Sequence, residues 1–243
     1  MHRLPETLTV NAATLPVRIK HPPRARRITL RYDPAQQAVL LTMPKRTPAR
    51  IVSAFLQEKQ GWIATQMQRY PNPVPFAEGA TIPILGKPYT LQRINATRGS
   101  VRQDAGALHI PSLPEHFHRR TEDWLKAHLR EFILREATPM AHMLDVSYRR
   151  VALRDTSSRW GSCSRGGNVS FCWRLVFAPD TIIRYVIAHE VAHLREMNHS
   201  PAFWQQVERL YPDYTHARNW LRTHNNELLR YGRPSLHSGQ PAI

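Results

Sequence analysis

Two histidines and a glutamate stand at a spacing that suits a metal ion. The segment 187–194 reads Ile-Ala-His-Glu-Val-Ala-His-Leu, so His189 and His193 are four residues apart. On a helix such residues lie one turn apart on the same face, where both imidazoles reach one zinc ion at about 2.0–2.1 Å. Glu190 then points toward the open side of the metal, where it can take a proton from zinc-bound water. The pattern predicts a hydrolase with one zinc ion per chain and Glu190 as catalytic base.

A third ligand is needed, because a catalytic zinc ion usually has three protein ligands and one open position. His199 follows His193 with five residues between them, a spacing that zinc proteases use. We expect Asn198 to end the helix in a left-handed conformation and the chain to turn back, which brings His199 under the metal. Glu208, on the next expected helix, is the rival ligand, and we favour His199 over it.

The helix that carries these residues is apolar on most of its surface. Its apolar positions are Ile182, Ile183, Val186, Ile187, Val191 and Leu194. A helix of this kind is buried, and buried histidines and carboxylates are costly unless they have partners. Two hydrogen-bonded core histidines beside an ion-paired Glu190 would also meet that need, but we favour the metal site.

A stretch of small polar residues around one tryptophan precedes this helix. Arg159 and Trp160 lie in the segment 157–164, and we take both as candidate substrate-binding residues. The strand expected at 169–176 could form the edge of a sheet and pair with an extended substrate through backbone hydrogen bonds. A plain hairpin with a packed tryptophan explains the pattern equally well. Nothing beside Cys163 would lower the pKa of its thiol, so we predict a structural role for this residue.

The chain has two cysteines. If residues 165–168 form a hairpin turn, Cys163 lies near Val169 and Cys172 near Trp160, so the two sulfurs are not opposite each other and no disulfide is expected. Reduced cysteines, together with a first segment that lacks an apolar secretory core, are typical of a cytoplasmic protein. No run reaches the roughly 18 apolar residues that a bilayer span requires, so we expect no membrane segment.

Apolar periodicity predicts an α+β protein with a mostly β amino-terminal region, residues 1–115, and a catalytic domain, residues 116–243. In the first region we expect strands at 8–19, 27–43 and 79–111, and a helix that Thr47 caps and that runs to Arg69. In the second we expect a helix at 116–144 that Pro139 kinks or breaks, strands at 148–154 and 158–176, and helices at 180–197, from 200 and at 213–230.

The charge of the chain is strongly unbalanced. Thirty-four Lys and Arg residues face 18 Asp and Glu residues in 243, a formal net charge of +16. A field of this sign attracts polyanions such as nucleotides and nucleic acid, and Arg favours bidentate contacts with phosphate or carboxylate. Charge alone identifies no partner, so nucleotide or nucleic-acid binding stays an open alternative.

Several motifs together resemble the YgjP-like metallopeptidase family, relatives of the SprT-like and WLM zinc proteases. They are Arg159-Trp160-Gly161-Ser162-Cys163-Ser164, Phe171-Cys172-Trp173-Arg174-Leu175, Ala178-Pro179, His189-Glu190-Val191-Ala192-His193-Leu194 and Asn198-His199-Ser200-Pro201-Ala202-Phe203-Trp204. The likeness is dense over 155–215, and Arg26-Arg27-Ile28 and Gln60-Gly61-Trp62-Ile63 extend it upstream. It implies a minimal zincin-like core, in which the active-site helix packs on a small antiparallel sheet. It also supports His199 as the third ligand.

These features favour a zinc-dependent metallopeptidase that acts on peptides or proteins. An Arg or Tyr would stabilise the oxyanion, and Arg159, Tyr211 and Tyr214 are the candidates.

Two other functions remain open. The family resemblance also implies a metal-dependent pyrophosphatase that acts on a nucleoside triphosphate of the UTP type. In that case arginines would hold the phosphates, and the candidates are Arg24, Arg26, Arg27 and Arg159. The second alternative is a protease that docks on nucleic acid through its basic surface and cleaves proteins bound there.

Overall fold

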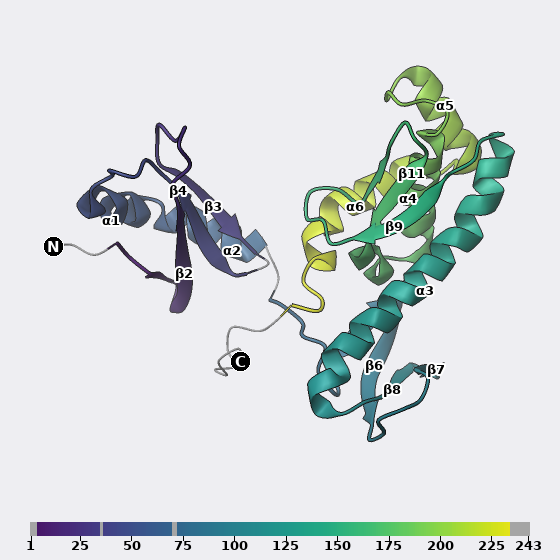
Figure 1. Ribbon diagram of the computed structural model, residues 1–243, viewed down its shortest axis with the longest axis horizontal. Coiled ribbons are helices and arrows are strands. Elements are labelled where there is room, and N and C mark those ends of the chain that lie inside the picture. The colour runs from purple at the N-terminus through teal and green to yellow at the C-terminus, as the bar shows by residue number, and fades with distance from the viewer. Residues whose placement is uncertain (1–3, 35, 70–71, 234–243) are drawn as a thin grey trace. The chain divides into compact units, whose positions relative to one another are not determined.

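The computed structural model describes residues 4–34, 36–69 and 72–233 of the chain (Figure 1). The chain divides between Asn72 and Pro73 into two compact units. We call the part before this point unit 1 and the part after it unit 2, and each has its own apolar core. Among the described helices, none combines the length and the apolarity that a bilayer crossing requires.

Unit 1 is a four-stranded sheet with two helices. Its elements are β1 (Thr7–Val10), β2 (Ala13–Lys20), β3 (Thr29–Asp33), β4 (Ala38–Thr42), α1 (Ala49–Glu58) and α2 (Gln60–Arg69). The strand order is β1-β2-β4-β3, in which β2 and β4 run parallel and the other pairs antiparallel. Side chains alternate between the two faces, and Val17, Val39 and Leu41 share a core with Val52 and Leu56 of α1.

The helix expected at 47–69 is two helices. α1 and α2 meet at Lys59, two residues before Gly61, and glycine has a low helix propensity. The hydroxyl of Thr47 donates to the carbonyl of Pro44 at 2.8 Å, so Thr47 does not cap the helix as expected.

A second four-stranded sheet opens unit 2. It comprises β5 (Thr81–Ile84), β6 (Lys87–Ile94), β7 (Arg102–Asp104) and β8 (Ala107–Pro111), in the order β5-β6-β8-β7. Its buried side chains, among them Ile82, Leu91 and Ile110, belong to the same core as the helices that follow. The boundary expected after residue 115 therefore falls inside unit 2. Alternation along a strand shows that one face is buried, but it does not show which element covers that face.

α3 (Pro114–Met143) is a single helix of 30 residues. The sequence predicts a kink or a break at Pro139, whereas the helix is not broken there. Leu125, Leu129 and Ile133 recur at helical spacing along one face and are fully buried. Packing of this face stabilises the helix against the loss of one backbone hydrogen bond at the proline.

The third sheet is the one beside the histidine motif. Its strands are β9 (Arg150–Arg154), β10 (Gly161–Cys163) and β11 (Asn168–Cys172), in the order β10-β11-β9. β10 pairs antiparallel with β11, but β9 pairs parallel with it, so the sheet is mixed where the resemblance implies an antiparallel one. β11 is central and β10 forms the edge, contrary to the edge position expected for 169–176. β11 buries most of its side chains, which suits a central strand.

The hairpin predicted for 165–168 is present. Cys163 lies opposite Val169, and the backbone N–H of Cys172 donates to the carbonyl of Trp160 at 2.8 Å. Both cysteines are free thiols, as the register predicts.

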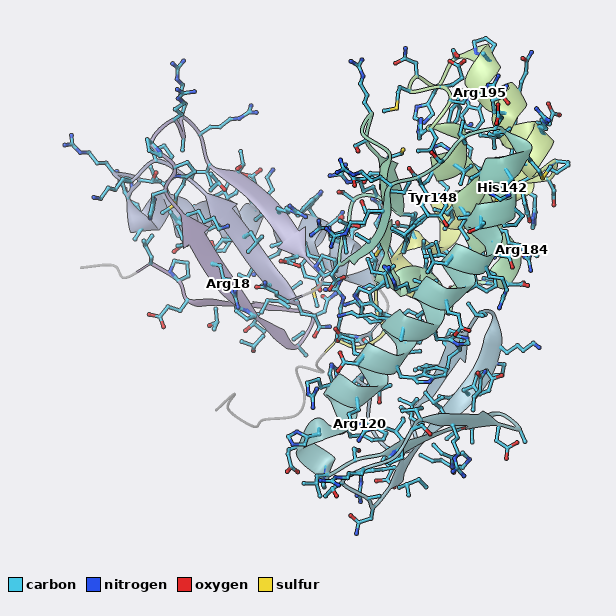
Figure 2. The ribbon with its side chains drawn as sticks, turned by 45° about the vertical axis from the view of Figure 1, so that its right-hand side comes forward. Arg18, Arg120, His142, Tyr148, Arg184 and Arg195 are labelled. Atoms are coloured by element: carbon cyan, nitrogen blue, oxygen red, sulfur yellow. The ribbon has the colours of Figure 1, made fainter. Side chains whose placement is uncertain are left out.

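Helices complete unit 2. The strand expected to reach 176 ends at Cys172, and the short 3-10 helix η1 (Trp173–Phe177) leads into α4 (Asp180–Ala192), α5 (Pro201–Leu210) and α6 (Tyr214–Leu228). α4 is buried along most of its length, as its apolar composition predicts. Arg184 of α4 pairs with Glu136 of α3, and Arg195 donates to the carbonyl of Leu144 at 2.6 Å (Figure 2). These bonds and the shared core hold α4 against α3, within an α+β fold whose amino-terminal part is rich in strands.

Candidate metal centre

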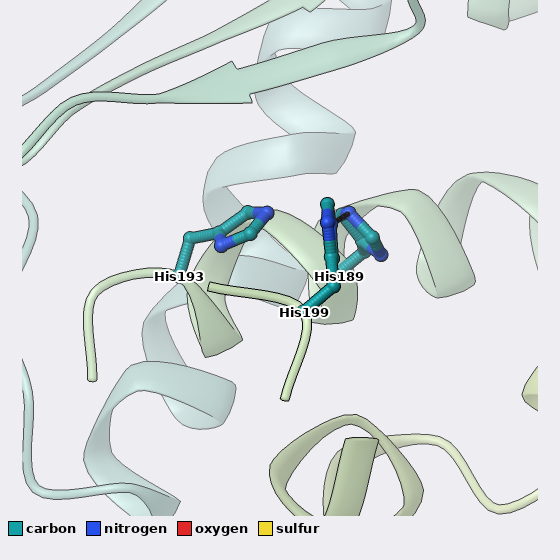
Figure 3. A group of neighbouring side chains, drawn as sticks. All are labelled: His189, His193 and His199. Carbon is teal, nitrogen blue, oxygen red and sulfur yellow. Dashed lines mark hydrogen bonds between the residues drawn. The ribbon is translucent and has the colours of Figure 1, made fainter. Parts of the chain in front are cut away.

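Three histidine rings face one another at the end of α4 (Figure 3). His189 lies in the last turn of the helix, His193 is its C-cap residue, and His199 follows in the loop before α5. The ring centroids of the three pairs are 4.9, 5.0 and 4.8 Å apart. One nitrogen of each ring lies within 4.8 Å of a nitrogen of the other two, and the described residues contain no second group of this kind.

The ring nitrogens have the spacing that one ion requires. Nε2 of His189 and Nε2 of His199 are 3.1 Å apart, and two nitrogens bound tetrahedrally to zinc are about 3.3 Å apart. Nδ1 of His193 lies 3.1 Å from the carbonyl oxygen of Glu196. A proton on Nδ1 makes this hydrogen bond and leaves Nε2 with a free lone pair. The three side chains therefore fit a single transition-metal ion.

The loop between α4 and α5 brings His199 to the other two rings. α4 ends at Ala192 and not at 197, and the φ of Asn198 is not positive, so the predicted left-handed end of the helix is wrong. The backbone closes one more turn after Ala192, in which the N–H of Glu196 donates to the carbonyl of Ala192 at 2.9 Å, and Nδ1 of His193 lies against the carbonyl of Glu196 where the chain leaves this turn. Ser200 caps α5, as predicted, by accepting a hydrogen bond from the backbone N–H of Phe203 at 3.4 Å.

An aromatic layer supports the three imidazoles. The ring of Phe203 is fully buried, and its centroid lies 4.9, 4.5 and 4.7 Å from those of His189, His193 and His199. Trp204 stacks on His199 at 5.9 Å, and Tyr214 stacks on Trp204 at 5.3 Å. Close packing of this kind fixes the ring orientations and keeps water away from one side of the cluster.

Glu190 points from α4 toward β10. Its side chain is buried, and Oε2 has no hydrogen-bond partner within the described part of the chain. Burial raises the pKa of Glu190 to about 8, and the positive charge of Arg159 opposes that rise. A Cβ atom added to Gly161 would lie 2.3 Å from Oε1 of Glu190, far inside contact distance. The carboxyl group can therefore occupy this place only because residue 161 has no side chain.

His189 and His193 are held in the form that binds metals. Burial, followed by the charges of His193, His199 and Arg218, lowers the pKa of His189 to about 3. Burial also lowers the pKa of His193. Because a metal ligand must be an unprotonated imidazole, these shifts favour ligation at neutral pH.

Two residues that the sequence did not single out border the cluster. Tyr185 precedes His189 by one helical turn, and their ring centroids are 6.1 Å apart; the ring of Tyr211 lies 6.3 Å from that of Tyr185. Arg218 of α6 lies over the ring of Trp204 at 5.0 Å, and its charge lowers the pKa of His189. The spacing of four residues could have revealed Tyr185. No local pattern marks Arg218, because tertiary packing brings α6 to this place.

The other predicted residues lie around β10 or outside the cluster. Arg159 is exposed, and its charge reaches Glu190, whereas Trp160 packs against the core of unit 2. Their roles in substrate binding stay predictions. Glu208 is exposed on α5 and is not part of the histidine cluster. Burial, followed by the charge of Glu190, raises the pKa of Cys163 to about 11, which keeps the thiol protonated and suits a structural role.

Residues 26–224 match the family described as YgjP-like, metallopeptidase domain. The chain belongs to the YgjP-like family. The family and the histidine cluster of this YgjP-like protein therefore both support a metal-dependent peptidase in general terms.

Solved structures and curated sequences show no close relative of the chain. One solved structure that the YgjP-like protein resembles is the crystal structure of the metallopeptidase zymogen of Pyrococcus abyssi abylysin, with 20% identity over 37% of this chain and 92% of that chain, at a TM-score of 0.35. We base no conclusion on a likeness this weak. No curated protein sequence matches the chain.

His199→Ala should sharply weaken zinc binding, whereas Glu208→Ala should leave it unchanged. His199 supplies one of three converging nitrogens, and Glu208 is exposed outside the cluster. Zinc stoichiometry by elemental analysis, and affinity by competition with a chelating dye, measure both variants against wild type. If His199→Ala binds zinc normally and Glu208→Ala does not, the third ligand is Glu208 and not His199.

Burial of Glu190 should also set the pH dependence of stability in the metal-free protein. Its pKa is about 8 in the folded state and ordinary in the unfolded state, so the folded state binds the extra proton. The contribution of Glu190 to stability is therefore lost as pH rises from about 5 to 8. Glu190→Gln removes this loss, so its Tm should exceed that of wild type by a margin that grows with pH. Thermal unfolding in chelator across this range measures the margin, and a constant margin would contradict the assignment.

Proposed function

We propose that this YgjP-like protein is a zinc-dependent metallopeptidase in which His189, His193 and His199 hold the metal and Glu190 is the general base. One observation supports this most strongly: three imidazole nitrogens lie within 4.8 Å of one another, and the residue after His189 is Glu190, whose buried carboxyl group has a raised pKa. A three-imidazole donor set suits zinc better than the hard cations Mg²⁺ or Ca²⁺, which take oxygen ligands. One zinc ion per chain follows from the one cluster that the described residues contain.

The metal and Glu190 have separate tasks. When bound, zinc supplies a Lewis acid that polarises a carbonyl oxygen and acidifies water. A nearby cation favours the ionised form of a carboxyl group, so Glu190 becomes a carboxylate close to neutral pH and can accept a proton from the attacking water. The same carboxyl group can then pass this proton to the leaving amine. Because Gly161 has no side chain, the carboxyl group of Glu190 has the space that it occupies against β10.

The edge strand β10 is placed to position a peptide. One side of β10 pairs with β11, and within the described part of the chain no strand pairs with the other side. β10 also lies against Glu190 through Gly161. An extended peptide that adds to this edge would make backbone hydrogen bonds along β10, with a carbonyl group close to the base. Arg159, which immediately precedes Trp160 and β10, would then lie beside the peptide.

Several groups remain candidates for stabilising the oxyanion. Tyr185 and Arg218 border the histidine cluster together with Tyr211 and Tyr214, and Arg159 acts on Glu190 from the side of β10. We favour Arg218, because its charge acts on the pKa of both His189 and Tyr185. A fixed positive charge at this place stabilises developing negative charge better than a neutral hydroxyl group.

The other functions have weaker support. A pyrophosphatase commonly uses Mg²⁺ with carboxylate ligands, and the described residues contain no such cluster of carboxylates. Docking on nucleic acid rests on the net charge of +16 and on the resemblance to the SprT-like proteases. We also propose a cytoplasmic location, which the two free thiols Cys163 and Cys172 support because reducing compartments preserve them.

Glu190→Gln should keep zinc and lower kcat for peptide hydrolysis by about 10²–10⁴-fold, the usual contribution of a general base. The amide has nearly the same shape but cannot accept the proton. Zinc content by elemental analysis and turnover of a peptide pool by mass spectrometry test both halves on one sample. Wild-type turnover in this variant would remove Glu190 from the mechanism. Hydrolysis of nucleoside triphosphates but of no peptide by the wild type would overturn the peptidase.

Gly161→Ala should lower turnover by about tenfold or more while zinc stays bound, because the added methyl group displaces the carboxyl group of Glu190. Gly61→Ala in α2 is the control, since a Cβ atom there meets nothing within 4 Å. Steady-state kinetics on the peptide cleaved by the wild type measures both variants. An active Gly161→Ala enzyme would show that the base does not work from the position seen here.

A further inference from the structure

A pocket of about 520 Å³ opens beside the metal ligand His193. Three parts of unit 2 form its walls: the segment before β9, the turn between β10 and β11, and the residues just after α4. Its lining includes Tyr148, Arg149, Arg165, His193, Leu194 and Met197. The proposed mechanism makes no use of this pocket.

The charge of the pocket has one sign. Arg149 and Arg165 are the charged side chains in the lining, and no carboxylate lines it. Both arginines are exposed, and among the described residues neither has an acidic partner within salt-bridge distance. Guanidinium groups bind carboxylates through paired, charge-assisted hydrogen bonds. A cation held by the histidines would add to the positive potential, because His193 belongs to both sites.

Backbone hydrogen bonds join the two segments that carry the arginines. The N–H of Arg149 donates to the carbonyl of Gly167 at 2.7 Å, and the N–H of Gly167 donates to the carbonyl of Ser164 at 2.9 Å. The φ of Gly167 is +74°, which a residue with a side chain adopts at a cost. Tyr148 is held as well, because its hydroxyl oxygen lies 2.8 Å from Oγ1 of Thr138 in α3 (Figure 2). The walls of the pocket are therefore tied by hydrogen bonds to the third sheet and to α3.

The pocket begins where the edge strand ends. β10 ends at Cys163, and the pocket begins with the next residue, Ser164. A peptide paired along β10 would therefore reach the pocket within a few residues of the group that faces Glu190. Leu194 and Met197 give one wall an apolar surface, which can cover the methylene groups of a long side chain.

We propose that this pocket is a specificity subsite for an acidic side chain, Glu or Asp, of the peptide substrate. The side chain belongs to a residue within about three positions of the scissile bond, since each residue of an extended chain spans about 3.3 Å. Its carboxylate binds Arg149 and Arg165, and its stem lies on Leu194 and Met197. The inference rests on the proposed peptidase function and names the class of substrate that this function would select.

Binding is tested apart from turnover. The zinc-loaded Glu190→Gln protein is titrated into fluorescent peptides that carry Glu, Gln or Lys at one position and are otherwise identical, and anisotropy gives Kd. We expect the Glu peptide to bind about five- to tenfold more tightly than the Gln peptide. Arg149→Glu and Arg165→Glu, each added to this protein, should abolish the preference and favour the Lys peptide. Arg154→Glu, on β9 outside the lining, is the matched control and should retain the preference.

Cleavage specificity is the second measurement. The wild-type zinc protein is incubated with a peptide library, and mass spectrometry gives the residues around each cut. Enrichment of Glu and Asp at one position near the cut, lost in Arg149→Glu and Arg165→Glu, supports the subsite. Cleavage without enrichment of Glu or Asp would overturn the subsite, as would an enrichment that remains in both Arg149→Glu and Arg165→Glu. Either result would still support the peptidase function. If no peptide is cleaved, the proposed function fails, and equal binding of the Glu and Gln peptides then overturns the subsite separately.

Discussion

The burial of ionisable groups in the apolar centre of unit 2 is the constraint on which the rest of this unit depends. Glu190 is buried within α4, and its Oε2 has no hydrogen-bond partner in the described part of the chain. A buried polar group left without a partner costs about 1–3 kcal/mol, and more if it is charged. A cation held by His189, His193 and His199, as proposed, would offset this cost, because it would add to the smaller stabilisation that the charge of Arg159 gives the carboxylate.

The part of the site built by one helix and the next turn could be predicted from the sequence. His189, His193 and Glu190 are related by helical spacing, and the apolar pattern of α4 predicts burial, which is complete for Glu190 and partial for the two histidines. Ser200 before Pro201 is a local cap signal, and the structure contains that cap. These features depend on backbone geometry over one or two turns, which residue spacing encodes directly. The α+β composition follows from the same local periodicities.

The remainder depends on packing between segments far apart in the chain. The central place of β11, the edge position of β10 and the division at Asn72 were not predictable, because alternation along a strand is the same whatever lies beside it. Arg218 reaches the histidines only through the packing of α6 on α4. The need for glycine at position 161 becomes visible only once the carboxyl group of Glu190 is placed against it.

The early end of α4 has an electrostatic consequence. The helix stops at Ala192 with His193 as its C-cap, so the three imidazoles gather at the carboxyl end of 13 helical residues. Peptide dipoles add along a helix and give that end a partial negative charge of roughly half an electron. This potential attracts a cation whatever the side chains are. A helix continued to residue 197 would have carried this charge about 7.5 Å further along its axis. The backbone of α4 would thus add to the affinity for the proposed metal ion.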